Sequence, residues 1–209
     1  MTPPGLTDAY ALSGPQDIAR LYAGWADSYD TGFAAGMDYR LPAEVASALL
    51  RAGPVAGAVL DAGAGTGLLA AALRGLGFAG ALDGIDLSDA MLERARAKGL
   101  YRALHRADLT QPLPRLGPYG GIVSSGTFTH GHVGPQALPG LLALAAPGAL
   151  VALSVNAGVW EALRFPAALA ALPIRDLDLT EVAIYGQAAA LADPAHAADR
   201  ALIVTFRTL

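Results

Sequence analysis

Three glycines between two aspartates form the part of this sequence best suited to binding a ligand. The run Val59-Leu60-Asp61-Ala62-Gly63-Ala64-Gly65-Thr66-Gly67 follows a short apolar segment. Glycines at such a turn let the backbone approach a ligand closely. Asp86 stands about 20 residues beyond the loop, where an acid in this kind of fold hydrogen-bonds ribose hydroxyls. The carboxyl ends of neighbouring parallel strands meet at one edge of a sheet, so we expect the loop and Asp86 to share one site.

Two cofactor classes compete for this glycine loop. A dinucleotide site requires G-x-G-x-x-G, but here Leu68 stands at the last position and Gly67 gives G-x-G-x-G instead. Asp61 directly precedes the loop, where its negative charge would disfavour a diphosphate and suit an ammonium group. S-adenosylmethionine has an ammonium group and a ribose but no phosphate. The residues therefore favour S-adenosylmethionine, and an NAD-dependent oxidoreductase is the less favoured alternative.

The elements around these residues alternate between strand and helix. Apolar periodicity predicts helices over 17–29, 41–52, 68–76, 89–98, 136–145 and 159–172, and strands over 58–60, 81–86, 100–105, 121–125, 149–155, 177–185 and 201–207. This alternation predicts an α/β fold, with a parallel sheet covered by helices on both faces. We expect one domain over 1–209, with a helical cap over 1–52 and a core over 53–209. The first dozen residues are expected to be loose.

Composition excludes several classes of protein. The 209 residues are 54% hydrophobic and 15% charged, which is typical of a compact globular chain. The net charge of −4 and the lack of a broad Lys/Arg cluster argue against a nucleic-acid partner. Prolines and glycines interrupt the uncharged region 116–160, so no apolar run approaches the roughly 20 residues that span a bilayer. We expect a cytoplasmic protein with no membrane partner, because the first residues lack the pattern of a secretion signal.

Several motifs resemble those of the class I S-adenosylmethionine-dependent methyltransferases. The glycine loop is similar to the first motif of the family, and Gly84-Ile85-Asp86-Leu87-Ser88 with Met91-Leu92 resembles the second. Ala107-Asp108-Leu109 resembles the third cofactor contact, and Tyr22-x-x-Trp25-x-x-x-Tyr29-Asp30 resembles a helix that closes over the cofactor. Within the family, Gly99-Leu100-Tyr101 and 126–131 are similar to the methyltransferase-like 27 group.

This resemblance implies a Rossmann-like fold with a mostly parallel seven-stranded sheet and a helical N-terminal extension. It also implies S-adenosylmethionine as cofactor and S-adenosylhomocysteine as product. Asp86 would bind the ribose, Leu87 and Met91 would flank the adenine, and Asp108 would meet the adenine amino group. The full set of expected cofactor-binding residues is Tyr29, Asp61, Ala62, Gly63, Gly65, Gly67, Asp86, Leu87, Met91, Asp108, Leu109 and Ser124.

Two histidines on the loop after the fourth strand are candidates for chemistry. His130 and His132 lie two residues apart, but no cysteine or nearby acid completes a metal site, so we expect no metal. Methyl transfer needs a base only when the acceptor must lose a proton. His130 would suit that role, and a solvated loop histidine is the alternative.

The acceptor is expected to be a small molecule. No Asn/Asp-Pro-Pro-aromatic motif follows the fourth strand, and no paired-glutamate loop is present, so the resemblance does not extend to the nucleic-acid, glutamine or arginine methylating branches. The aromatic residues Tyr22, Trp25, Phe128 and Trp160 are candidates for its pocket. A regulatory protein that binds S-adenosylmethionine without catalysis is the main alternative. The chain is expected to be a monomer or a homodimer.

One position departs from the family. An aromatic-Asp pair usually enters the fourth strand, but this chain has Tyr119-Gly120-Gly121. We expect this difference to affect the stability of this end of the strand more than it affects cofactor binding.

Overall fold

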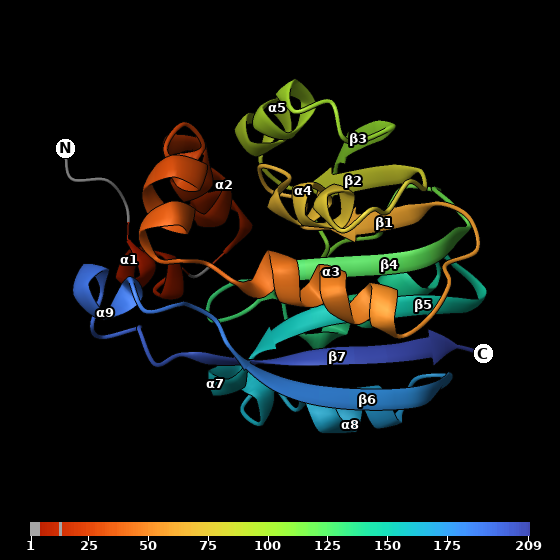
Figure 1. The fold of residues 1–209 in the computed structure, drawn as a ribbon. Coiled ribbons are helices and arrows are strands. Elements are labelled where there is room, and N and C mark those ends of the chain that lie inside the picture. The colour runs from red at the N-terminus through yellow and green to blue at the C-terminus, as the bar shows by residue number, and fades with distance from the viewer. Residues whose placement is uncertain (1–4, 13) are drawn as a thin grey trace.

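The computed structural model describes residues 5–12 and 14–209, which form one seven-stranded sheet flanked by helices (Figure 1). The strand order is β3-β2-β1-β4-β5-β7-β6. The strands are β1 (Val59–Ala62), β2 (Leu82–Asp86), β3 (Ala103–Arg106), β4 (Tyr119–Phe128), β5 (Ala145–Asn156), β6 (Ile174–Ala183) and β7 (Arg200–Thr208). Strands β1 to β5 pair in parallel, and β7 lies antiparallel between β5 and β6. The expected α/β fold with a mostly parallel sheet is confirmed.

The helices occupy both faces of the sheet and the edge where the parallel strands end. They are α1 (Leu6–Tyr10), α2 (Pro15–Trp25), the π-helix η1 (Tyr29–Ala34), α3 (Leu41–Arg51), α4 (Leu68–Gly75), α5 (Asp89–Ala97), the 3-10 helix η2 (Pro135–Ala137), α6 (Leu138–Leu142), α7 (Ala157–Trp160), α8 (Phe165–Ala170) and α9 (Ala189–Ala192). Figure 1 shows α1, α2 and α9 gathered beyond the carboxyl ends of the parallel strands. Within the described residues, no helix is long and apolar enough to cross a membrane.

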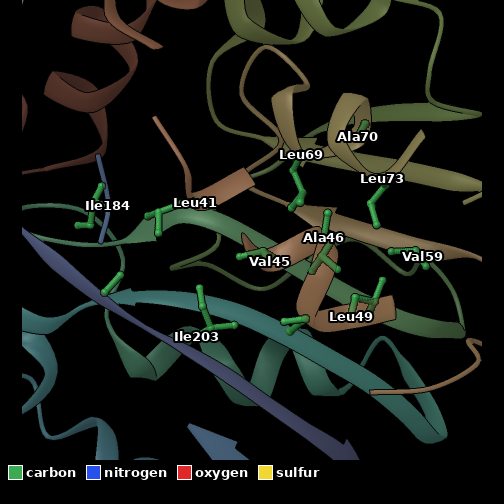
Figure 2. Close-up of a cluster of buried hydrophobic side chains, with 14 of the residues drawn as sticks. Leu41, Val45, Ala46, Leu49, Val59, Leu69, Ala70, Leu73, Ile184 and Ile203 are labelled. Carbon is green, nitrogen blue, oxygen red and sulfur yellow. The ribbon is translucent and has the colours of Figure 1, made fainter. Parts of the chain in front are cut away.

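The sheet is buried between two apolar layers. On one face, α3 packs against the sheet beside α4, and its apolar residues recur at helical spacing. Figure 2 shows this cluster, which includes Leu41, Val45, Ala46, Leu49, Val59, Leu69, Ala70, Leu73, Ile184 and Ile203. On the other face, α6 and α8 pack against Ile122 and Val151. Burial on both faces explains why the central strands are continuous apolar runs.

Two of the expected helices differ in the structure, one by an interruption and one by its shorter length. The pattern over 159–172 predicts one helix, but the structure has α7 and α8 with a break at Arg164, whose φ is +60°. Pro166 follows at the start of α8, because proline lacks the N–H that a continuous helix would use. The helix expected over 136–145 is likewise reduced to η2 and α6, and β5 already begins at Ala145.

The N-terminal region also differs from expectation. The helix predicted over 17–29 ends at Trp25, and a π-helix follows from Tyr29. The first dozen residues were expected to be loose, but α1 is ordered and buries Leu6 and Ala9; residues 1–4 lie outside the described part of the chain. Apolar contact with the rest of the fold fixes this short helix, since five residues form no stable helix alone.

The strand end that departs from the family pattern is held by a polar cluster. The Tyr119 hydroxyl donates to Asp83 Oδ2 at 2.9 Å, and Arg102 donates to both oxygens of Asp83 at 2.9 and 2.6 Å. A Cβ on Gly120 would lie 1.7 Å from the carbonyl oxygen of Ala56. The close approach of that backbone therefore excludes an aspartate at position 120, and the cluster around Asp83 ties the neighbouring strands together.

Candidate active site

A cavity of ≈520 Å³ opens at the edge of the sheet where the parallel strands end. The turns after β1, β2, β3 and β4 form one side of it, and α2 and the segment before it form the other. Small-molecule sites in open α/β sheets lie at this edge, and the volume is in the range of such sites.

The glycine loop forms the floor of the cavity. Gly63, Ala64, Gly65 and Thr66 line it directly, as expected for the first two glycines. A Cβ on Gly63 would lie 2.1 Å from Thr127 Oγ1, so only glycine allows the loop to pack this closely against the end of β4. Gly65 has φ +53° and nothing within 4 Å of where its Cβ would be, so its backbone faces open space.

Asp86 connects the end of β2 to the glycine loop. Its Oδ2 accepts a hydrogen bond from the Gly65 backbone N–H at 2.8 Å, and its Oδ1 accepts one from the Ser88 N–H at 2.8 Å. Burial raises the pKa of Asp86, and the backbone N–H groups oppose this shift. Each carboxylate oxygen can accept a further hydrogen bond, so Asp86 can still bind hydroxyl groups from the cavity.

Asp61 lies beneath the loop and is not among the described residues that line the cavity. Its Oδ2 accepts a hydrogen bond from the Tyr101 hydroxyl at 2.6 Å, and its Oδ1 is buried with no hydrogen-bond partner in the described part of the chain. Burial raises the pKa of Asp61 to about 7. The sequence pattern did not predict this contact between Tyr101 and Asp61, although Tyr101 belongs to the Gly99-Leu100-Tyr101 motif.

The residues expected around an adenine ring line one side of the cavity. Leu87, Met91, Asp108 and Leu109 all lie there. Asp108 Oδ1 accepts hydrogen bonds from the backbone N–H and the hydroxyl of Thr110, at 2.8 and 2.6 Å. Two apolar side chains and one carboxylate thus come together from the ends of β2 and β3.

Besides Asp61, three of the expected cofactor residues lie below the cavity rather than line it. Ala62, Gly67 and Ser124 are not among the described lining residues. The fully buried Ser124 donates its hydroxyl to the carbonyl oxygen of Ala62 at 2.6 Å, and Thr127 donates to the same oxygen at 3.2 Å. These bonds hold the end of β1 against β4 under the loop.

The N-terminal segment covers the cavity and is anchored to the core by Asp30. Asp30 Oδ1 accepts from the Thr66 hydroxyl of the glycine loop at 2.5 Å, and Oδ2 accepts from Lys98 Nζ at 2.6 Å. Asp27 forms a second ion pair, with Arg94 of α5. Tyr29, expected to contact the cofactor, lines the cavity beside these anchors.

Comparison with known proteins agrees with this arrangement. The family model described as a methyltransferase domain matches residues 33–199. The chain belongs to the class I methyltransferases. Methyltransferase-like protein 27 from Homo sapiens is 39% identical over 154 residues, which are 70% of this chain. The matched region corresponds to 62% of the human protein, less than two thirds of its length.

Solved structures show the same fold for this methyltransferase family member. The DhpI–SAH complex matches with a TM-score of 0.64 at 19% identity, covering 93% of this chain and 96% of DhpI. The [4+2]-cyclase SpnF matches with a TM-score of 0.67 at 17% identity, covering 94% of this chain and 97% of SpnF. At such identities the likeness concerns the fold alone.

The two loop histidines, His130 and His132, have different surroundings. His130 packs its ring against Tyr10, with centroids 4.8 Å apart, and is not among the described residues lining the cavity. His132 does line the cavity. The sequence did not distinguish this histidine from His130. The role expected for His130 stays a prediction.

Only one of the four aromatic pocket candidates lines this cavity. Tyr22 does so, whereas Trp25 and Phe128 line a smaller neighbouring cavity of ≈40 Å³. Trp160 stacks on Phe165 with an interplanar angle of 6° and belongs to the core on the other face of the sheet.

Proposed function

We propose that this protein transfers a methyl group from S-adenosylmethionine to a small molecule. The observation that carries the proposal is the Asp86 carboxylate at the end of β2, which is bonded to the glycine loop and borders the cavity. An acid in this position binds ribose hydroxyls in Rossmann-like folds. Family membership and the order of the strands give independent support.

The residues present fit this cofactor. Asp86 would hold the ribose, Leu87 and Met91 would hold the adenine between apolar side chains, and Asp108 would accept from its amino group. Asp61 Oδ1, buried and unbonded within the described residues, is the nearest acid below the glycine loop for an ammonium group. When bound, the cofactor supplies an electrophilic methyl group on a sulfonium.

The chain's own contribution is to position the acceptor and to exclude water. Positioning supplies much of the acceleration for an in-line displacement at an activated centre. Apolar residues such as Ile18, Val133 and Leu163 line the cavity alongside the proposed cofactor contacts. A net charge of −4 argues against a nucleic acid as acceptor, and a cavity of ≈520 Å³ favours a small molecule.

Calorimetric titration tests the proposal directly. S-adenosylhomocysteine should bind to the purified protein, whereas NAD should not, because Leu68 replaces the third glycine of the dinucleotide motif. Binding of NAD alone would overturn the proposal in favour of an oxidoreductase. Release of S-adenosylhomocysteine from S-adenosylmethionine in the presence of small acceptors then separates an enzyme from a protein that only binds the cofactor.

A further inference from the structure

The part of the cavity wall formed by α2, the segment before it and the loop after β4 is uncharged. Helix α2 and the segment before it contribute Leu12, Pro15, Ile18 and Tyr22, and the loop after β4 contributes Thr129, His132 and Val133. Among the described lining residues, the charged ones are Asp86 and Asp108, and both belong to the proposed cofactor side. No lining cation among these residues would pair with an anionic acceptor, and no acid on the α2 side would pair with a cationic one. The chemistry of this part therefore favours an uncharged acceptor.

Two polar side chains meet within this apolar wall. His132 Nδ1 lies 2.7 Å from the carbonyl oxygen of His130, and His132 Nε2 lies 3.0 Å from the Tyr22 hydroxyl. A carbonyl oxygen can only accept, so Nδ1 carries the proton in the neutral ring. The lone pair of Nε2 is then free to accept the hydrogen bond that the Tyr22 hydroxyl donates.

We propose that His132, acting through the Tyr22 hydroxyl, takes the proton from a small uncharged hydroxyl compound as its oxygen is methylated. This inference rests on the proposed function. The acceptor O–H bond breaks and its proton passes to Tyr22 Oη, while the Tyr22 proton passes to His132 Nε2. The acceptor oxygen forms a bond to the methyl group of a sulfonium donor, whose carbon–sulfur bond breaks with the electron pair left on sulfur. The products are a methyl ether, a thioether and a protonated His132, so the total charge is unchanged.

The protonation states of the pair agree with this role. Burial lowers the pKa of His132, so the ring is neutral near pH 7 and can accept a proton. Burial also raises the pKa of Tyr22, so its hydroxyl keeps the proton that it donates to His132. The titratable groups that face the pair are His130 on the same loop, Tyr10, Tyr29 and Tyr39 from the N-terminal region, and Asp86 across the cavity.

His132 is better placed than His130 for this chemistry. Both Tyr22 and His132 line the cavity, whereas the described lining does not include His130. A Cβ on Gly158 would lie 2.8 Å from the His130 ring, so that ring is packed against the start of α7. A proton acceptor must come within hydrogen-bond reach of the proton, directly or through one intermediate group.

The test compares wild-type protein with His132→Gln and Tyr22→Phe, using phenol, benzyl alcohol and 4-nitrophenol as probe acceptors. Release of S-adenosylhomocysteine gives kcat across a range of pH. We expect His132→Gln to lower kcat for phenol by about 10²–10⁴-fold, while the dissociation constant of S-adenosylhomocysteine stays the same. The loss should be much smaller for 4-nitrophenol, which ionises readily without a base. A merely structural role would lower both rates equally, and that result would overturn the proposal.

The pH profile and a spectroscopic signal give independent readouts. Wild-type kcat should fall only at pH values below the ordinary histidine range, because His132 must be neutral, and His132→Gln should lose this acid limb. Nitrogen-15 NMR of labelled histidine should show the Nδ1–H form of His132 in the free protein, with an Nε2 signal that shifts in Tyr22→Phe. A His132 protonated on Nε2 contradicts the assignment.

The controls separate this proposal from the one on which it rests. His105→Gln makes the same change on β3, outside the described lining of the cavity, and should leave kcat unchanged. A loss in His130→Gln with none in His132→Gln would return the role to His130. If the protein binds no S-adenosylhomocysteine, the proposed function fails. If it binds S-adenosylhomocysteine but methylates no phenol or alcohol, the acceptor class assigned here is wrong.

Discussion

At the scale of single residues, Asp86 has two tasks that use the same carboxylate. It fixes the glycine loop through the Gly65 N–H, and it borders the cavity where a ribose would lie. The hydrogen bond to Gly65 forms within the protein itself, whereas hydrogen bonds to a ribose would form only when a ligand is bound. Removing the side chain should therefore affect binding more than folding.

We predict that Asp86→Ala weakens S-adenosylhomocysteine binding by about 10- to 150-fold, since hydrogen bonds to a charged group contribute about 1.5–3 kcal/mol. Calorimetric titration of the folded variant measures this change. Asp89→Ala is the matched control, because Asp89 is an exposed acid three residues further along that pairs only across the surface with Arg106. Wild-type affinity in Asp86→Ala would refute the ribose-binding role.

At the scale of elements, side-chain contacts from Asp30 attach the π-helix η1 to the core. Asp30 joins η1 to the glycine loop through Thr66 and to the end of α5 through Lys98. Tyr29 lines the cavity next to this anchor. We therefore expect Asp30 to couple the position of η1 to the glycine loop, and its loss to ease the exit of a bound ligand.

We predict that Asp30→Asn speeds the dissociation of S-adenosylhomocysteine about 5-fold. The substitution removes the ion pair with Lys98, a partly exposed pair of about 1 kcal/mol, while the amide oxygen can still accept from Thr66. Stopped-flow displacement measures the rate. Asp27→Asn should change it little, because the Asp27–Arg94 pair lies on the surface, with the Asp27 side chain 82% exposed. Equal rates in the two variants would show that Asp30 does not hold the cap closed.

At the scale of the whole molecule, the buried Asp61 makes the stability of the fold depend on pH. Burial raises its pKa from 3.8 to about 7. A raised pKa in the folded state means that the protonated form is favoured there. The contribution to stability is therefore complete below pH 3.8 and is lost as pH rises to about 7.

We predict that ligand-free wild-type protein loses up to about 4 kcal/mol of unfolding free energy over this range, at about 1.4 kcal/mol per pH unit, relative to Asp61→Asn. The amide of the variant stays uncharged, and its oxygen can still accept from Tyr101. Urea unfolding at several pH values measures the difference. Asp178→Asn on the exposed strand β6 controls for the substitution itself. Parallel pH profiles for wild type and Asp61→Asn would contradict the prediction.

The amino-acid sequence alone predicted the fold and the residues on the side of the cavity that we propose for the cofactor. Strand, glycine turn and helix are local features, and the carboxyl ends of neighbouring parallel strands must meet at one edge. Sequence position alone therefore predicted four residues that line the cavity, which are Asp86, Leu87, Met91 and Asp108. The apolar run from Leu150 to Leu153 in β5 is likewise typical of a strand that is buried on both faces.

Only the tertiary structure shows which residues lie on the side of the cavity that we propose for the acceptor. Side chains in loops follow no regular period, so nothing in the sequence distinguishes His130 from His132. The contact that distinguishes them joins His132 to Tyr22, 110 positions earlier in the chain. The partner of Asp61 is also distant in sequence, since Tyr101 lies 40 residues beyond it. Such contacts form only when separate elements pack together. Packing also ordered α1 and turned Trp160 into the core, against expectations drawn from local pattern.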